Sequence, residues 1–175
     1  MAFPVGHAAA GLAAARALGA PVGERAVWTL GIALLAVVPD FDYILVWPLG
    51  YSRAQYHRTW THSLLVAAAV ALVVALAHAR LTRKPFSWRP LLIYFAVVAS
   101  HGIVDVLMVD NRSEHGVPLF WPFLPERLGW RSPFVPFYEL FHPNARNVLR
   151  AAVPYTLVEL LLGIPVWIWL WRKRK

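Results

Sequence analysis

The sequence contains no cysteine, which excludes disulfide bonds and leaves histidine and carboxylate side chains as the candidates for holding a metal ion. Charged residues are also scarce. They make up 15% of the 175 residues, whereas hydrophobic residues make up 59%. Soluble domains contain about a quarter charged residues, so the composition favours an integral membrane protein with a single domain, residues 1–175.

The net charge of +8 would suggest a nucleic-acid partner if the protein were soluble. Here many of the basic residues form short clusters beside apolar runs, and this pattern is typical of membrane topology. We therefore expect the lipid bilayer, and not nucleic acid, to be the partner of this chain. The sequence leaves the oligomeric state open.

Five apolar stretches predict an all-α integral membrane bundle of about five spans, since about 20 apolar residues cross a bilayer as a helix. The predicted helices cover about residues 3–20, 26–47, 61–79, 91–109 and 153–171. Residues 111–150 are different, because six of the fourteen prolines lie between Pro118 and Pro143, among many aromatic residues. Dense proline excludes one long helix, and aromatic residues favour the bilayer interface, so we expect an interfacial loop there.

The positions of the basic residues predict the orientation of these spans. The cytoplasmic side of a membrane protein carries the denser positive charge in its short segments. With Arg172–Lys175 placed in the cytoplasm, five spans put the N-terminus outside. Arg16, Arg25 and the basic connection Arg80–Arg89 then also lie on the cytoplasmic side.

On this topology a set of ionisable residues converges on the outer face of the membrane. An ionised aspartate near mid-bilayer costs about 2.5–3.5 kcal/mol, and Arg58 is the basic residue best placed to compensate. A divalent cation would offset several carboxylates at once, and thiolate-free ligands suit Zn²⁺, or else Mn²⁺ or Fe²⁺. We predict a site for one or two ions. The candidate ligands are His7, Asp40, Asp42, His57, His62, His101 and Asp105.

Local spacing supports ligation by two pairs of these residues. His101 and Asp105 are four residues apart on a predicted helix, so they project from the same face one turn apart. Asp40 and Asp42 follow Pro39, which disfavours helix at the residue before it. In an extended turn, residues two apart point the same way, so we expect both carboxylates to reach one site.

The two remaining histidines of the set are five residues apart and would diverge on a continuous helix. We therefore expect His57 to lie in the loop that precedes the third helix, and His62 at its entrance. Thr59 or Thr61 is expected to cap that helix, because a threonine hydroxyl can accept a hydrogen bond from a free amide of the first turn.

Two rival interpretations of the polar residues remain. The same carboxylates could serve an ion or proton transporter, because ionisable residues inside a membrane often mark such a pathway. They could instead form a polar network that holds the helices of a non-catalytic membrane scaffold together. Metal analysis of a purified sample separates the enzyme from the scaffold.

Four short motifs occur in an order that resembles the YdjM-like family of bacterial membrane-bound metal-dependent hydrolases, some members of which are described as LexA-regulated. Together with His7, the motifs extend over about two-thirds of the chain. They are Pro39-Asp40-Phe41-Asp42, His57-Arg58-x-x-Thr61-His62-Ser63, Ser100-His101-Gly102-x-x-Asp105 and Gly116-Val117-Pro118-Leu119-Phe120-Trp121-Pro122-Phe123.

This resemblance implies a hydrolase in the bacterial inner membrane. Its ligand pattern is distantly similar to zinc-dependent phospholipase C and P1 nuclease, which implies an ester or phosphoester substrate, such as a lipid or a lipid-linked compound. In such a reaction Asp40 or Asp42 would act as general base. Arg58 would stabilise the anionic transition state, because its planar guanidinium suits phosphate or carboxylate.

Overall fold

The computed structural model of the protein describes residues 4–42, 57–108, 116–130, 156–157, 159–161 and 163–172. Within these ranges the chain is mostly helical and contains no strand, apart from an isolated bridge between Val117 and Leu128. The expected all-α class is therefore confirmed for this part of the chain. Its elements are α1 (Pro4–Ala17), α2 (Ala26–Val37), η1 (Val38–Phe41), η2 (Trp60–His62), α5 (Leu64–Thr82), α6 (Trp88–Leu107) and α9 (Ile164–Trp171), where η denotes a 3₁₀-helix.

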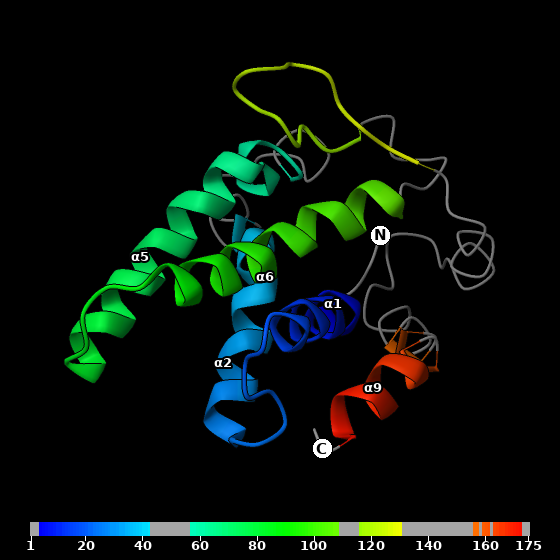
Figure 1. Cartoon of the computed structure of the whole chain (residues 1–175). Helices are drawn as coiled ribbons and strands as arrows, with labels where there is room; N and C mark the ends of the chain where they lie inside the picture. Colours follow the sequence, from blue (N-terminus) through cyan, green and yellow to red (C-terminus); the bar gives the residue numbers. More distant parts are fainter. Residues whose placement is uncertain are drawn as a thin grey trace.

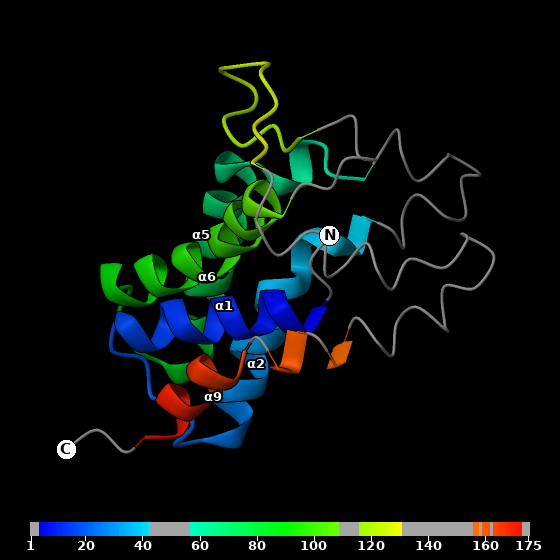
Figure 2. The ribbon, with the colours of Figure 1, turned by 90° about the vertical axis from the view of Figure 1, so that its right-hand side faces the viewer.

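The helices are arranged around α6. A short connection joins α5 and α6 into a hairpin, and α2 packs against α6 (Figure 1). In Figure 2, α1 lies between α6 above and α9 below. The loop of residues 116–130 covers the end of the hairpin where α5 begins, and the amide of Leu64 donates to the carbonyl of Leu119 there.

Small residues form much of the contact surface between the helices. Ala67, Ala71 and Ala75 are buried and recur at every fourth residue, along one face of α5. Small side chains let helix backbones approach closely, which is how helices pair within a membrane. The bulky residues of α5 point outward instead: Val73 is 66% exposed. This apolar outer surface is typical of a helix that faces lipid.

Among the described residues, two helices are long and apolar enough to cross a membrane, namely α5 with 19 residues and α6 with 20. The other described helices are shorter, although α2 and η1 together form an apolar segment from Ala26 to Phe41. Residues 156–157 and 159–161, which precede α9, are also helical. Length and composition therefore support two spans, and the bundle of about five spans stays a prediction.

The predicted interfacial loop, residues 111–150, is described only in part. Residues 116–130 form turns and the isolated bridge, without helix, as dense proline requires. Phe123 and Trp130 expose most of their side chains there. The remainder of the predicted loop lies outside the described residues.

Helix α1 is fastened at both ends by the C-terminal part of the chain. Near its start, the amide of Gly6 donates to the buried carboxylate of Glu159 at 2.9 Å. Near its end, the guanidinium of Arg16 is buried and donates to the backbone carbonyls of Leu170 and Arg172. Arg16, which we counted among the charges of a cytoplasmic connection, is thus a buried group that holds α9 against α1.

The prediction of an extended turn at Asp40 and Asp42 is wrong. The helical path continues through Pro39, changing from α2 to the 3₁₀-helix η1 at Val38. Pro39 lies in the first turn of η1, where a missing N–H breaks no hydrogen bond. The proline therefore tightens the helix and does not end it, and the two aspartates leave from a 3₁₀ turn.

The predicted cap of the third helix is also wrong. We expected Thr59 or Thr61 to cap it, but α5 begins at Leu64 and its cap is Ser63, whose hydroxyl accepts from the amide of Val66 at 3.3 Å. The three residues before Ser63 form the separate helix η2. This break turns the chain, so that residues 57–62 lie across the end of the hairpin and do not extend α5.

Two glycines in the middle of helices should respond in opposite ways to alanine. A Cβ at Gly11 would lie 2.4 Å from Cβ of Ala36, so Gly11→Ala forces α1 away from α2 and should cost about 1–3 kcal/mol. A Cβ at Gly31 would meet no atom of the described residues within 4 Å beyond its own helix backbone. Gly31→Ala should therefore gain about 0.5–1 kcal/mol of helix stability.

Thermal unfolding of the two variants in the same detergent measures both effects. We expect a lower Tm for Gly11→Ala and an equal or higher Tm for Gly31→Ala. A fall in Tm of similar size for both variants would contradict the close contact between α1 and α2.

Candidate functional site

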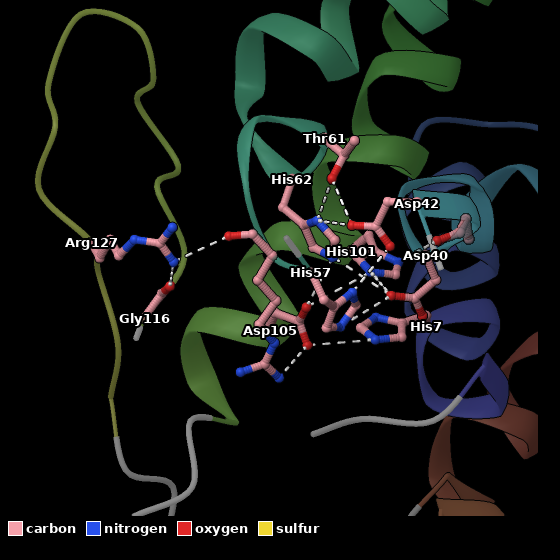
Figure 3. Close-up of polar contacts among 12 residues, drawn as sticks. His7, Asp40, Asp42, His57, Thr61, His62, His101, Asp105, Gly116 and Arg127 are labelled. Carbon is pink, nitrogen blue, oxygen red and sulfur yellow. Dashed lines mark hydrogen bonds and ion pairs between the residues drawn. The ribbon is translucent and has the colours of Figure 1, made fainter. Parts of the chain in front are cut away.

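Seven side chains from four parts of the chain meet at one end of the bundle (Figure 3). Six of them are buried, and Asp40 is 16% exposed. The predicted convergence is therefore confirmed as geometry, and we call this set the histidine–aspartate cluster. Its members are His7 of α1, Asp40 of η1, Asp42 after η1, His57 before η2, His62 of η2, and His101 and Asp105 of α6.

Four atoms of the cluster face one another at its centre. Asp40 Oδ1 lies 3.5 Å from His62 Nε2 and 3.3 Å from His101 Nε2. Asp105 Oδ2 lies 3.4 Å from His62 Nε2 and 3.8 Å from His101 Nε2, as expected for residues one turn apart. Ligands held at about 2.0–2.2 Å by a tetrahedral zinc ion lie about 3.3–3.6 Å from one another. Three of these four distances match that spacing, and Asp40, His62 and His101 form one group whose ligand atoms all lie within 4.8 Å of one another.

The orientation of His101 is fixed from outside the cluster. Its Nδ1 lies 2.8 Å from the carbonyl oxygen of Ala36, at the end of α2. A carbonyl can only accept, so Nδ1 carries the proton and donates. In the neutral ring Nε2, which faces the carboxylates, then keeps its lone pair. This is the arrangement by which a metal-binding histidine is held by a hydrogen bond behind it.

Asp42 orients two further histidines from behind. Its Oδ1 accepts from His57 Nδ1 at 3.1 Å, and its Oδ2 accepts from the hydroxyl of Thr61 at 3.0 Å. Because the Thr61 proton is used in that bond, the Thr61 oxygen accepts from His62 Nδ1, which lies 3.0 Å away. Asp42 thereby sets the tautomer of His57 directly and that of His62 through Thr61.

These contacts leave three Nε2 lone pairs facing one carboxylate oxygen. Asp40 Oδ1 lies 3.8 Å from Nε2 of His57, in addition to the two shorter distances to His62 and His101. Burial lowers the pKa of His62 below its ordinary value, which favours the neutral ring. Lone pairs and a carboxylate oxygen repel one another unless a positive charge lies between them.

Several buried atoms at the centre have no hydrogen-bond partner among the described residues. They are His62 Nε2, His101 Nε2 and Asp105 Oδ2. Buried polar atoms of a folded protein are nearly always paired, and these three are the atoms that a cation would contact. The residues therefore fit a metal ion, and three groups of them bring their ligand atoms within 4.8 Å of one another.

The three groups overlap, which bears on the number of ions. His101 belongs with His7 and Asp105 in one group and with Asp40 and His62 in another. His7 stacks on His101, with their ring centroids 3.6 Å apart, and its Nε2 lies 3.6 Å from Asp105 Oδ1. Shared ligands of this kind suit one ion or two adjacent ions, as in two-metal sites.

Arg58 lies against this centre in a strained backbone conformation. Its φ of 59° lies in the left-handed region that non-glycine residues seldom adopt. Its Nη2 donates to Asp105 Oδ1 at 3.0 Å, whereas Nε and Nη1 are buried without a hydrogen-bond partner among the described residues. The guanidinium thus compensates one carboxylate, as expected, and keeps two donors for an anion.

Sequence reasoning missed two residues that shape the site. Thr61, expected as a helix cap, links Asp42 to His62. Arg127 in the loop donates from Nη1 to the carbonyl oxygens of Arg58, at 3.3 Å, and of Gly116, at 3.1 Å. The contact with Arg58 joins residues 69 positions apart, so no local pattern could have revealed it.

A family model described as the YdjM inner membrane protein matches residues 1–173. No curated protein and no solved structure matches the chain.

Metal content should depend on the inward-facing ligands. We expect His101→Ala and Asp105→Ala to remove at least one ion, because each deletes an atom at the centre of the cluster. His78→Ala is the matched control, since His78 lies outside the cluster and pairs with Tyr94. Elemental analysis of the purified variants measures the metal content of each. Full metal content in both cluster variants would contradict the assignment of these ligands.

Proposed function

The chain belongs to the YdjM inner membrane protein family, and we propose that it is a metal-dependent hydrolase of that membrane. Its substrate is an amphipathic ester, and a phosphoester fits best. The observation that carries this proposal is the set of inward-facing Nε2 atoms and carboxylate oxygens at the centre of the cluster.

A purely structural polar network explains that observation poorly. Such a network would pair each buried donor with an acceptor, whereas the central atoms lack partners among the described residues. With neutral histidines, the carboxylates of Asp40, Asp42 and Asp105 together with the guanidinium of Arg58 leave a net charge of minus two. One divalent ion neutralises that charge in a region where uncompensated charge is costly.

Zinc is the ion that the donor set favours. Imidazole nitrogens and carboxylate oxygens without thiolates suit Zn²⁺, and they also accept Mn²⁺ or Fe²⁺. The proposed inner ligands are Nε2 of His62 and His101 with oxygens of Asp40 and Asp105. His7 and His57 belong to two further, separate groups of possible ligands, which share His101 and His62 respectively with the inner set.

Each side chain then has its own role in the proposed hydrolysis. When bound, the metal supplies a water molecule whose pKa is lowered to about 7. Asp40 is the most exposed of the three carboxylates, so its second oxygen, which is not offered to the metal, is the proton acceptor in this proposal. Arg58 directs its two unpaired donors at the anion that develops on the substrate. Asp42 holds His57 and Thr61 and is a positioning residue, not the general base.

The amphipathic character of the substrate is inferred from the loop beside the cluster. Phe120, Trp121 and Trp130 expose apolar surface on the described part of that loop. Arg127 fastens the loop to the backbone of Arg58, so the aromatic side chains and the anion-binding guanidinium belong to one unit. A lipid or a lipid-linked compound carries both the apolar and the anionic part.

We place this site at the non-cytoplasmic face of a multi-pass protein, with the C-terminus in the cytoplasm. A reporter enzyme that works only in the cytoplasm should be active when it is fused after Lys175, because the basic tail stays on that side. Fusions at both termini of the full chain, tested with reporters active on opposite sides, measure this. Periplasmic activity of the C-terminal fusion would place the cluster on the cytoplasmic face.

Hydrolysis should depend on Arg58 more than metal content does. Arg58→Ala should lower turnover roughly 100-fold or more, as loss of one transition-state donor does, and should leave the metal in place because a guanidinium is not a ligand. Arg80→Ala, at the exposed far end of α5, is the control. The assay measures metal-dependent release of phosphate or phosphoalcohol from a panel of lipids and lipid-linked phosphates.

A metal-loaded sample that cleaves no ester would exclude the hydrolase. Metal-dependent ion flux in vesicles would then favour the transporter, and its absence would favour the scaffold. Equal loss of turnover in Arg58→Ala and Arg80→Ala would instead remove Arg58 from the reaction.

A further inference from the structure

A second feature of the molecule lies away from the cluster, in the crevice between α2 and α5. It is a groove of about 740 Å³, within the range of small-molecule sites. Its walls are almost entirely apolar. The polar side chains that line it are His78, Thr82 and Tyr94, and they bond with one another: His78 Nδ1 pairs with the Tyr94 hydroxyl, and Thr82 donates to the carbonyl of His78.

Gly31 widens this groove in the middle of α2. Glycine destabilises a helix interior relative to alanine, so a mid-helix glycine calls for a reason. Gly11 has one, because Ala36 of α2 packs against it, but a Cβ at Gly31 would meet no atom of the described residues within 4 Å beyond its own helix. Close packing among the described residues therefore does not account for Gly31. A side chain at this position would narrow the groove, because Gly31 is part of its lining.

One end of the groove lies on the chain segment that also carries two residues of the histidine–aspartate cluster. Its lining extends along α2 and η1 from Val27 to Phe41, and Phe41 stands between Asp40 and Asp42 in the chain. This is about 20 Å at the rise of a helix. One leaflet accounts for half of a hydrocarbon core that is about 30 Å thick, so a lipid chain of about 15 Å fits the groove.

We propose that this groove binds the hydrocarbon chain of the substrate, while the head group lies at the cluster. The inference rests on the proposed function and specifies its substrate as a lipid with at least one long chain. Apart from the indole of Trp28, the wall along α2 consists of apolar side chains and Gly31, which suits a hydrocarbon and disfavours a peptide backbone or a sugar. Aromatic contacts of Trp28 with His78 and Tyr94 close the far end.

The test uses the full chain in vesicles of phosphatidylethanolamine and phosphatidylglycerol. A small fraction of phosphatidic acid carries a photoactivatable diazirine midway along one acyl chain, and peptide mass spectrometry maps the adducts. We expect adducts on the groove-facing residues of α2 and on the segment of α5 from Val74 to Thr82. Gly31→Phe should lower this labelling at least fivefold, because the ring fills the groove.

Leu30→Phe is the matched control, because Leu30 is 61% exposed and lies on α2 outside the groove. It should label like the unchanged chain. Gly31→Leu serves as a second, smaller variant, and the Tm of each variant checks its fold. Equal labelling of all variants would mean that bulk lipid merely covers α2. Crosslinked dimers in place of lipid adducts would mean that a second copy occupies the groove. Either result overturns the proposal.

Turnover separates failure of this inference from failure of the proposed function. Gly31→Phe should reduce cleavage of the long-chain phosphoester that is the best substrate, and should leave cleavage of a water-soluble phosphoester of short chain unchanged. Equal cleavage of both by Gly31→Phe would overturn the groove and keep the hydrolase. Groove labelling without cleavage of any ester by metal-loaded protein would exclude the hydrolase and leave a lipid-binding groove.

Discussion

The structure depends on one electrostatic constraint: three carboxylates must lie in an apolar helical bundle. Each would be costly alone, and together Asp40, Asp42 and Asp105 exceed the charge that Arg58 supplies. The chain gathers them at one point, surrounds them with histidine rings, and packs small residues between the helices so that the segments come close enough. The same concentration of negative charge creates the demand for a cation and the means to bind it.

The convergence of the polar residues could be predicted because it follows from that constraint alone. Ionisable groups in apolar segments are costly unless they lie next to compensating groups. The helical spacing of His101 and Asp105 already placed these two residues on one face. The local backbone could not be predicted in the same way. Pro39 suggested an extended turn, but the fixed φ and missing N–H of proline are equally compatible with the first turn of a 3₁₀-helix. Only the packing of η1 on α6 decides between them.

The division of roles among the ligands was beyond sequence reasoning for a different reason. Asp40 and Asp42 are chemically identical and two residues apart, and nothing in the pattern tells which faces inward. The partners behind them decide it: Thr61 and His57 occupy Asp42, and the carbonyl of Ala36 fixes His101 from a position 65 residues away. Such partners are backbone atoms or common side chains, so they leave no signature in the sequence.

The two contacts that fasten α1 have a consequence for biosynthesis. His7 lies near the start of the chain, yet its helix is held by Glu159 and by the carbonyls of Leu170 and Arg172. During translation these partners leave the ribosome more than a hundred residues after His7. His7 therefore takes its place in the cluster only when α9 arrives, and the cluster is completed late in maturation. Incomplete chains would therefore lack the finished histidine–aspartate cluster.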